Sequence, residues 1–402
     1  MYMEQQTISI FIRRKELLPN IIKLARYAKA PELGPNLLFF SGGSALRHLS
    51  SSLIKYTYNS IHLITPFDSG GSSATLRRAF NMLAIGDIRN RLMALADKTL
   101  HGNPYIFRLF AHRFSKDESQ ANLISDLEKM IAGKHCLVVH IPDPMRKIIR
   151  HHLLRFRELM PPDFDLRGAS IGNLILTAGF IENRRHPDQI IYIFSKLIEV
   201  RGVVRPVINE NYHLAVELED GRVIEGQHQI TGKEVEPITV PVKRLFIIDR
   251  EKNGREVTVG IRDKVKELIC SAELICYPMG SFYTSLLATL LPRGAGTVIS
   301  QNSCPKVFIP SMGFDPERTG MTITDQALAL LATLQNDAPD AEISELLNFV
   351  IIDSKRGDYN IKPDKREITA LGIEVIDMPL VSKKSEPLID STLLLGILLS
   401  LA

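Results

Sequence analysis

The feature that most constrains the fold is a pattern that occurs twice between residues 36 and 80: an apolar run, a glycine-rich turn and a helical pattern. The first apolar run, residues 36–40, ends in Ser41-Gly42-Gly43-Ser44, and the second, residues 61–64, leads to Gly70-Gly71-Ser72-Ser73. Strands that are joined through a helix run parallel, and a parallel sheet needs helices on both faces. We therefore predict an α/β fold with a doubly wound, mostly parallel sheet. In such folds, ligands gather at the carboxyl ends of the strands.

Five further apolar runs have the length of strands, and we expect them to extend the same sheet. They are residues 136–141, 245–248, 274–277, 306–309 and 349–352. The pair Asp220-Gly221 lies between two other apolar runs and is a strong hairpin signal. It predicts a small antiparallel β excursion at about residues 205–235. The charged segment at about residues 115–162 has helical spacing and predicts a helical insertion.

These predictions place one main domain, residues 36–385, between two terminal segments. Residues 1–35 are expected to form an N-terminal extension outside the sheet, and residues 386–402 a core helix that begins near Asp390. The final apolar run is far shorter than the roughly 20 residues that cross a bilayer, and the N-terminus shows no export signal. We therefore expect a cytoplasmic protein that does not bind membranes.

Composition argues against several classes of function. The 402 residues contain 49 Lys and Arg against 45 Asp and Glu, and a net charge of +4 on a chain of this length does not predict nucleic-acid binding. The four cysteines lack metal-ligand spacing and are too few for a disulfide scaffold, so we expect free thiols. The chain contains no H-E-x-x-H or G-x-S-x-G motif, which argues against a zinc enzyme and a serine hydrolase.

The two glycine-rich turns are the first candidates for a binding site. A turn between a strand and a helix presents backbone N–H groups and the helix dipole to an anion such as phosphate, and glycines allow close approach. For Gly42, Gly43 and Ser44, a plain tight turn is an equally good interpretation. For Asp68, at the end of the second strand, contact with a ribose hydroxyl or a divalent cation is favoured over a turn-forming or capping role.

Further candidates flank the same strand ends. Asp87 is placed to cap the helix that begins near Gly86, and Arg89 has the donors to bind phosphate, although a solvated surface position suits it as well. Residues 278–285 follow another predicted strand and supply small residues and hydroxyls. The predicted nucleotide-binding residues are Gly42, Gly43, Ser44, Gly70, Gly71, Ser72, Ser73, Arg77, Asp87, Arg89, Asn90, Asn173, Gly280, Ser281 and Thr284.

The order of these segments resembles the family that unites 2-phospho-L-lactate transferase with the gluconeogenesis factor. The matching segments are FSGGSALRHLS, TPFDSGGSSATLRRAF, GDIRNRLMALAD, IGNLILTA, RGVVRPV, LEDGRVIEG and YPMGSFYTSLL. Two of them, GDIRNRLMALAD and LEDGRVIEG, are more similar to the gluconeogenesis-factor branch. The chain as a whole looks nearest to a transferase-like subgroup that is associated with an ATP-grasp gene system. The resemblance implies a Rossmann-like fold with a nucleotide moiety bound across the glycine-rich strand ends.

The chain departs from the pattern of the family it resembles in four places. Ser44-Ala45 stands where the family carries Thr-Gly, Ser69 replaces the second of two aspartates, Ala169 replaces a histidine, and Ser311 replaces an asparagine. The missing aspartate removes half of a possible metal grip. These changes favour the retention of binding over the retention of catalysis.

The leading hypothesis is therefore a nucleotide- or nucleotide-sugar-binding protein. The alternative that the resemblance implies is a phosphotransferase that moves a phospholactyl-like group from a nucleotide donor to a hydroxyl acceptor such as a deazaflavin. In that alternative, Asp68 is the catalytic and metal-binding residue and Mg²⁺ is the cation. No permanently bound organic cofactor is expected. The apolar C-terminus and the resemblance favour a homodimer.

Overall fold

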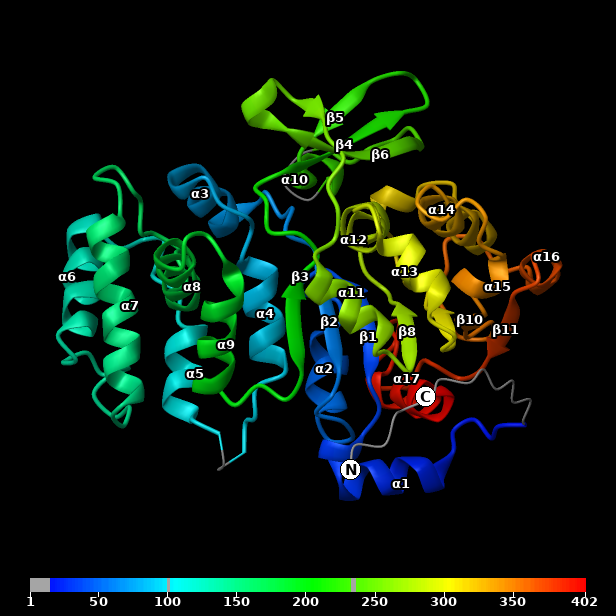
Figure 1. Cartoon of the computed structure of the whole chain (residues 1–402), viewed down its shortest axis with the longest axis horizontal. Coiled ribbons are helices and arrows are strands. Elements are labelled where there is room, and N and C mark those ends of the chain that lie inside the picture. The colour runs from blue at the N-terminus through cyan, green and yellow to red at the C-terminus, as the bar shows by residue number, and fades with distance from the viewer. Residues whose placement is uncertain (1–14, 100–101, 233–235) are drawn as a thin grey trace, which may run out of the picture.

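The computed structural model describes residues 15–99, 102–232 and 236–402. Its centre is a seven-stranded sheet in the order β11-β10-β9-β8-β1-β2-β3, in which every neighbouring pair is parallel (Figure 1). The strands are β1 (Leu37–Ser41), β2 (Ile61–Ile64), β3 (Val203–Pro206), β8 (Leu274–Tyr277), β9 (Lys306–Phe308), β10 (Phe349–Ile352) and β11 (Glu374–Asp377). The predicted α/β fold is confirmed.

The strand order reverses once, between β1 and β8. From β1 the chain builds outward through β2 to β3, and it then returns to the other side of β1 and builds outward again from β8 to β11. The connections that leave β1 and β8 therefore diverge, which opens a crevice at the carboxyl ends of these strands.

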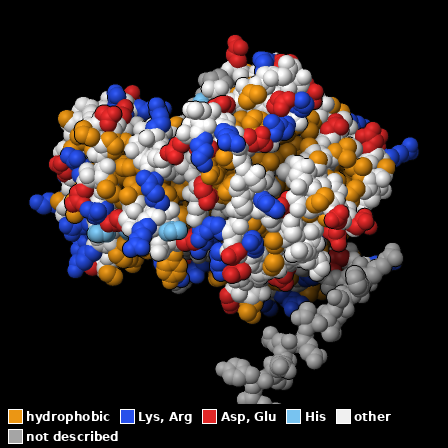
Figure 2. Space-filling model, turned by 45° about the horizontal axis from the view of Figure 1, so that its top comes forward, with side chains coloured by type: hydrophobic (Ala, Val, Ile, Leu, Met, Phe, Trp, Pro, Cys, Tyr) orange, Lys and Arg blue, Asp and Glu red, His pale blue; other side chains and the backbone are white. Residues whose placement is uncertain are grey.

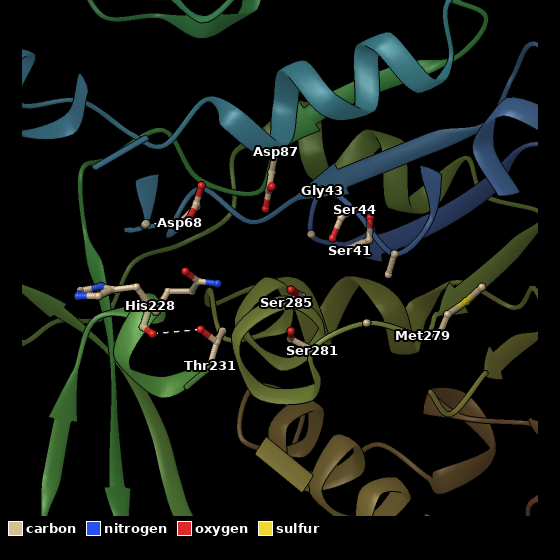
Figure 3. A pocket seen from close by; sticks show the side chains of 15 residues that line it. Ser41, Gly43, Ser44, Asp68, Asp87, His228, Thr231, Met279, Ser281 and Ser285 are labelled. Atoms are coloured by element: carbon tan, nitrogen blue, oxygen red, sulfur yellow. Dashed lines mark hydrogen bonds between the residues drawn. The ribbon is translucent and has the colours of Figure 1, made fainter. Parts of the chain in front are cut away.

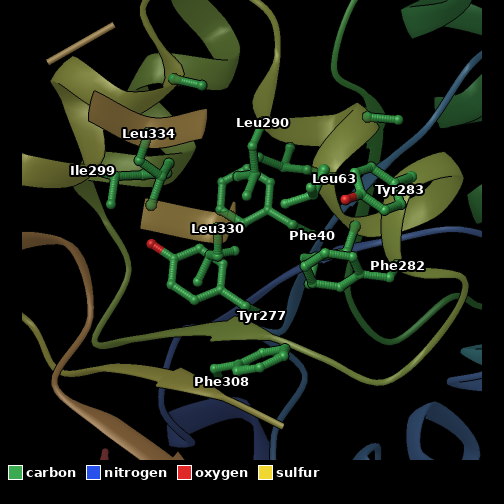
Figure 4. Close-up of a cluster of buried hydrophobic side chains, with 14 of the residues drawn as sticks. Phe40, Leu63, Tyr277, Phe282, Tyr283, Leu290, Ile299, Phe308, Leu330 and Leu334 are labelled. Carbon is green, nitrogen blue, oxygen red and sulfur yellow. The ribbon is translucent and has the colours of Figure 1, made fainter. Parts of the chain in front are cut away.

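Successive side chains of β1 point to opposite faces of the sheet, and both faces are buried because helices cover each of them. Leu38 and Phe40 belong to the core that Figure 4 shows, with Tyr277 and Phe308. Leu37 lies in the core on the opposite face. The helices in the second half of the chain are α11 (Asp263–Cys270), η3 (Phe282–Leu287), α12 (Ala288–Leu290), α13 (Ala295–Gln301), α14 (Ile323–Gln335), α15 (Ile343–Leu346), α16 (Lys365–Ala370) and α17 (Ser391–Leu401).

A large helical region separates β2 from β3 and has a core of its own, to which Leu127, Leu153 and Phe156 belong. Two of its helices, α6 and α7, lie where the sequence predicts a helical insertion, and further helices continue on both sides of them (Figure 1). Before it, α2 (Arg47–Leu53) joins β1 to β2. The helices of the region are α3 (Gly71–Phe80), α4 (Gly86–Ala94), α5 (Pro104–Ala111), α6 (Gln120–Ile131), α7 (Met145–Leu159), α8 (Ile171–Glu182) and α9 (Pro187–Leu197).

The strand predicted at residues 136–141 is wrong. This segment forms consecutive turns between α6 and α7, in which the backbone N–H of Val138 donates to the carbonyl of His135 at 2.8 Å and that of Ile141 to the carbonyl of Val138 at 3.0 Å. Val138 and Ile141 are buried in the helical core. A short apolar run is typical both of a buried strand and of a buried turn, and here the adjacent helices determine the outcome.

A four-stranded antiparallel sheet, in the order β5-β4-β6-β7, lies beyond the carboxyl ends of the central strands (Figure 1). Its elements are β4 (His213–Leu218), β5 (Val223–Glu225), α10 (Gln227–Ile230), β6 (Val242–Asp249), η2 (Arg250–Lys252) and β7 (Arg255–Glu256). The predicted hairpin is confirmed in β4 and β5. The placement of residues 245–248 in the central sheet is wrong, because they belong to β6 and pair with β4. Residues 233–235 of the expected excursion lie outside the described residues.

The two ends of the described chain lie against each other. α1 (Ile21–Lys29) is followed by η1 (Pro31–Leu33), and the ammonium of Lys23 donates to the carbonyl of Ser400 in α17 at 2.8 Å. The carboxylate of Asp390 caps α17 by accepting from the N–H of Thr392, as predicted. Residues 1–14 of the expected extension lie outside the described residues. Because most apolar side chains of α17 are buried within this chain, they do not require a second subunit, and the homodimer stays a prediction.

Two properties of the surface bear on the predicted partners. Lys and Arg side chains are interspersed with Asp and Glu over the face that Figure 2 shows, as the small net charge suggests. None of the helices in the described residues is both long and apolar enough to cross a membrane.

Candidate functional site

A cavity of about 270 Å³ lies at the carboxyl ends of β1, β2 and β8, where the strand order reverses. Its walls come from the loops that follow these strands, from the first turn of α4 and from α10 (Figure 3). The lining residues are 41–45 after β1, Asp68 and Gly70 after β2, 279–281 with Ser285 after β8, Asp87 of α4, and Gln227, His228 and Thr231. We call this the central cavity. It is the place where a fold of this kind binds its ligand.

The loop after β1 requires glycine because side chains of other loops approach it closely. A Cβ atom at Gly43 would lie 2.0 Å from the carboxylate of Asp87, and one at Gly42 would lie 2.6 Å from the hydroxyl of Ser285. Cβ atoms do not approach other atoms this closely, so a side chain at either position would require Asp87 or Ser285 to move. The predicted residues Gly42, Gly43 and Ser44 all line the central cavity, and the close approach favours more than a plain tight turn.

The buried side chain of Arg91 holds this loop in place. One Nη atom donates to the carbonyl of Gly42 at 2.9 Å and to the hydroxyl of Ser41 at 3.2 Å, and the other donates to Ser50. Burial lowers the pKa of Arg91 to about 10, so the guanidinium is charged at neutral pH. Sequence reasoning missed Arg91. The burial of Arg91 could have been inferred from its position on the helix face that also carries the apolar residues Ile88 and Leu92.

The loop after β2 is held in a similar way by Arg77. All five N–H groups of its guanidinium find acceptors within the protein, among them the carbonyls of Phe67 and Asp68, the side chain of Asn211 and the carbonyl of Tyr212. Arg77 does not line the central cavity. The structure gives it a positioning role, and because Arg77 also lines a neighbouring cavity of about 850 Å³, its contact with a nucleotide stays a prediction.

Asp68 faces the central cavity from this loop (Figure 3). One of its carboxylate oxygens accepts from the N–H of Gly70 at 3.1 Å, so the residue also forms the turn that its alternative interpretation predicts. The second oxygen is directed towards Gly86, at whose position a Cβ atom would lie 3.4 Å from it. The turn and a ligand contact are thus compatible in one carboxylate.

Ser69 joins the same loop to the antiparallel sheet. Its hydroxyl lies 2.8 Å from Nδ1 of His228 and accepts from the backbone N–H of that residue at 3.1 Å. His228 lies 159 residues after Ser69 and belongs to no recognisable motif. The sequence analysis therefore did not identify it as a site residue. The departure from paired aspartates at Ser69 therefore replaces a carboxylate with a contact between the two sheets.

Asp87 supplies the second carboxylate of the central cavity. The prediction that it caps the helix is wrong: Ile85 is the N-cap of α4, and Asp87 lies in the first turn with its side chain towards Gly43. Arg89 and Asn90 line an adjacent cavity of about 260 Å³, which shares Gly43 with the central cavity.

The loop after β8 forms the third wall. Ser311 fixes it: its hydroxyl accepts from the N–H of Gly280 at 2.7 Å and donates to the carbonyl of Gly280 at 2.9 Å. Gly280 has φ +151°, a conformation that favours glycine. The structure thus assigns a contact to Ser311, where the sequence shows only a departure from the family pattern.

Glu317 caps η3, the helix that begins in this loop. Its carboxylate accepts from the N–H groups of Tyr283 and Thr284 and from the hydroxyl of Thr284 at 2.6 Å. Burial and the nearby charge of Asp315 raise the pKa of Glu317 to about 7. Thr284 is fully buried and does not line the central cavity, whereas the predicted Gly280 and Ser281 do.

The remaining predicted residues lie close to the central cavity without lining it. Gly71 and Ser72 line neighbouring cavities, while Ser73 and Asn173 are buried. The amide nitrogen of Asn173 lies 3.5 Å from the hydroxyl of Ser72. The loops that follow β1, β2 and β8 thus meet as predicted. Buried members of the predicted set, such as Ser73 and Asn173, pack behind these loops and do not line the cavity.

The donor set for a metal ion is limited in the central cavity. Asp68 and Asp87 are its carboxylates, and Mg²⁺ is commonly held by one or two carboxylates together with substrate phosphates and water. Within the described residues, one group of three potential ligands comes within 4.8 Å, namely His151, His152 and Glu182 in the helical region. Glu182 is already ion-paired with Arg155 at 2.8 Å. These two carboxylates are too few to hold a divalent cation without further ligands, and Mg²⁺ stays a prediction for this cavity.

Comparison with known proteins connects this geometry to a family. The family model described as 2-phospho-L-lactate transferase CofD matches residues 37–381, which include all three loops of the central cavity. The chain belongs to this family. The resemblance that the sequence motifs indicate is confirmed.

Individual proteins similar to this chain support the same family assignment. The chain is 27% identical over 366 residues to the gluconeogenesis factor of Bacillus subtilis strain 168, a match that covers 88% of this chain and 93% of the relative. It is 28% identical to the gluconeogenesis factor of Halalkalibacterium halodurans, covering 74% and 73%. A crystal structure of a UPF0052 family protein from Bacillus halodurans matches with a TM-score of 0.66 and 23% identity, covering 91% of this chain and 99% of that one. This last likeness concerns the fold alone.

Proposed function

We propose that the central cavity binds the phosphates of a nucleotide or a nucleotide sugar. The observation that carries the proposal is the convergence of three loops of small residues at the point where the strand order reverses. Backbone N–H groups at such strand ends suit phosphate oxygens. The carboxylates of Asp68 and Asp87 would repel a phosphate placed against them, so a binder that works without Mg²⁺ holds its phosphates at the glycine-rich loops, away from both. In a transferase, a divalent cation between the carboxylates and the phosphate removes that repulsion.

The neighbouring cavities provide room for the rest of such a ligand. The central cavity, at about 270 Å³, is smaller than a typical site for a whole nucleotide sugar. A cavity of about 850 Å³ adjoins it at His228, and the cavity of about 260 Å³ adjoins it at Gly43. The base and the sugar can therefore extend to either side of the phosphates.

Group transfer is the second candidate function, and Asp87 favours it. The sequence shows one carboxylate where the family pattern has two, and the fold brings Asp87 to the same cavity from α4. A bound Mg²⁺ would supply charge neutralisation for the transferred phosphoryl group. Asp68 would accept the proton of the attacking hydroxyl, whose oxygen forms a bond to phosphorus while the phosphorus–oxygen bond to the donor breaks and the remaining nucleotide leaves. Asp68 and Asp87 would both hold the cation.

A thermal-shift panel tests the binding proposal. Purified protein is melted with UDP-sugars, guanine nucleotides and ATP, each with and without Mg²⁺, because a ligand of the native state raises the melting temperature. A selective rise with a UDP-sugar that does not depend on Mg²⁺ supports a nucleotide-sugar binder. A rise with guanine nucleotides that depends on Mg²⁺ supports a transferase. A flat panel contradicts both proposals.

Substitution of Asp68 separates the two functions. In Asp68→Asn, a transferase loses turnover and the Mg²⁺ dependence of binding, whereas a binder keeps most of its nucleotide affinity. Asp220→Asn, in the exposed turn of the β4–β5 hairpin, is the matched control and should behave as wild type.

A further inference from the structure

A second cavity, of about 530 Å³, lies within the helical region, between the start of α3 and the segments that follow α5 and precede α8, and none of the functions above uses it. Gly71, Ser72 and Thr75 of α3 form one wall, and Gly168 with Arg113 and Lys116 forms the other. We call it the basic cavity. It adjoins the loop that carries Asp68, because Gly70 lines the central cavity and Gly71 lines this one.

The basic cavity is lined by more cationic side chains than carboxylates. Arg167 is ion-paired with Asp165 at 2.9 Å. Arg113 and Lys116 make no ion pair with any described residue, and Asp165 is the carboxylate among the lining residues. Both side chains are exposed, and a 2.6 Å hydrogen bond from Nη1 to the carbonyl of Gly168 orients the guanidinium of Arg113 at the cavity wall.

A third cation lies behind this wall. Arg89 donates to the hydroxyl of Ser170, the residue whose backbone pairs with Arg113, and its Nε atom is buried without a hydrogen-bond partner in the described structure. Burial, and the charges of Arg113 and Arg47, lower the pKa of Arg89 to about 10. The charge of Asp87 offsets part of this effect on Arg89, and an anion in the basic cavity would lower the remaining repulsion between the cations.

Neutral donors surround the same space. α3 is ten residues long and begins at Gly70 without a side-chain cap, so its first N–H groups and the positive end of its dipole face the cavity wall. Ser72 and Thr75 add hydroxyls. Asn173 is 2% exposed, its amide lies against Ser72, and its carbonyl oxygen has no hydrogen-bond partner. Because this oxygen only accepts hydrogen bonds, its missing partner is a donor, such as a hydroxyl of the organic part of a ligand.

We propose that the basic cavity binds the phosphate group of a second ligand, distinct from the nucleotide of the central cavity. Two unpaired cations, a helix N-terminus and two hydroxyls suit a dianion of phosphate size better than a single carboxylate. The volume fits a small phosphomonoester. If the protein is a transferase, this ligand is a phosphorylated acceptor, whose hydroxyl would reach Asp68 past Gly70 and Gly71. That last step rests on the proposed function, and the phosphate site does not.

Binding of inorganic phosphate to the full-length protein tests the proposal. Isothermal titration is run with phosphate and with acetate, in the presence and absence of a nucleotide that responds in the thermal-shift panel. The double variant Arg113→Gln/Lys116→Gln should weaken phosphate binding at least about tenfold, because charge-assisted contacts are lost. Nucleotide affinity should stay within about twofold of wild type.

Two further variants guard the interpretation. Lys116→Gln alone removes a side chain that donates no hydrogen bond to a described residue, so it tests the charge without disturbing the fold. Lys134→Gln, exposed in the same helical region, is the matched control and should bind phosphate as wild type does.

Three outcomes overturn the inference: no phosphate binding to the wild type at millimolar concentration, equal binding in wild type and double variant, or competition between phosphate and nucleotide. Binding of acetate as tight as that of phosphate also contradicts a site for a dianion. If nucleotides fail to bind while phosphate binding depends on Arg113 and Lys116, the proposed function fails and the phosphate site stands.

Discussion

Buried arginines organise the candidate site at the level of single residues. Arg77 and Arg91 do not line the central cavity, and each donates hydrogen bonds to backbone carbonyls of one of its loops. A guanidinium suits this role because its donors form a rigid planar fork that can reach several acceptors at once. The loops of the central cavity therefore keep their shape in the absence of a ligand, which lowers the entropy that binding must overcome.

Arg91→Met should destabilise the protein by about 3 kcal/mol, since it leaves the carbonyl of Gly42 and the hydroxyl of Ser50 without their charged donor. The melting temperature measures the loss. Arg366→Met, on the exposed side of α16, is the matched control and should change stability by less than about 0.5 kcal/mol. Equal melting temperatures for the two variants would show that Arg91 is not an anchor.

Glu317 should make stability depend on pH. Its pKa is raised from 4.5 in the unfolded chain to about 7 in the fold, so the native state holds the proton more tightly. The resulting stabilisation is complete below pH 4.5 and is lost as the pH rises through 7, by up to about 3 kcal/mol. Melting temperatures of wild type and Glu317→Gln, recorded between pH 5 and 8, should converge or cross in this interval. Parallel curves would contradict the assignment.

At the level of elements, the site depends on loops that touch one another more than on any single helix. The carboxylate of Asp87 occupies the space that a side chain at position 43 would need. The first turn of α4 therefore packs directly against the loop after β1, and a larger side chain in that loop should displace the carboxylate of Asp87.

Gly43→Ala tests this contact. The new methyl group would lie 2.0 Å from Oδ1 of Asp87 and should push the carboxylate out of place, which lowers affinity for the responding nucleotide by roughly tenfold to a hundredfold. Isothermal titration gives the affinities. Gly260→Ala is the control, because its nearest contact would be an ordinary 3.5 Å. Unchanged affinity in Gly43→Ala would remove Asp87 from the site.

Sequence patterns correctly predicted the elements and loops whose structure is determined by residues close to them in the sequence. The unit β1-α2-β2, the glycine-rich loops, Asp68 and the capped C-terminal helix all follow from spacing, glycine chemistry and hydrophobic periodicity within short windows. The pattern does not show what a segment packs against. Residues 245–248 have the composition of a buried strand, and only tertiary pairing with β4 places them in the second sheet.

The missed site residues have the same cause. His228 and Ser69 are 159 residues apart, and Ser311 and Gly280 are 31 apart, so no local window contains either contact. Arg91 was hidden for a different reason. An arginine in a helical pattern is usually solvated, and its burial depends on acceptors that come from β1 and α2.

At the level of the whole molecule, the sheet has an independent core on each face. α17 completes one of them from the end of the chain, and it packs Leu394 and Leu398 against the face that carries Leu37. A core that is closed by the last helix depends on that helix for the integrity of the whole sheet.

Leu398→Ala should therefore destabilise the protein by about 2–5 kcal/mol, because the side chain is fully buried and its removal leaves a cavity. Leu393→Ala, in the same helix but 37% exposed, should cost much less. Thermal denaturation of the two variants compares them directly. Similar melting temperatures would mean that α17 is not part of the sheet core.

The reversal of strand order also has a consequence for how the protein is made. β1 pairs with β8 on one side, and Leu37 and its partner Leu274 are 237 residues apart (274 − 37). At about 5–20 residues per second, a ribosome needs roughly 10–50 s to cover that interval. During this time one edge of β1, whose first four residues are apolar, has no strand to pair with, and such an edge readily joins other chains. The newborn chain is therefore most prone to aggregate, and most in need of a chaperone, before β8 has been synthesised.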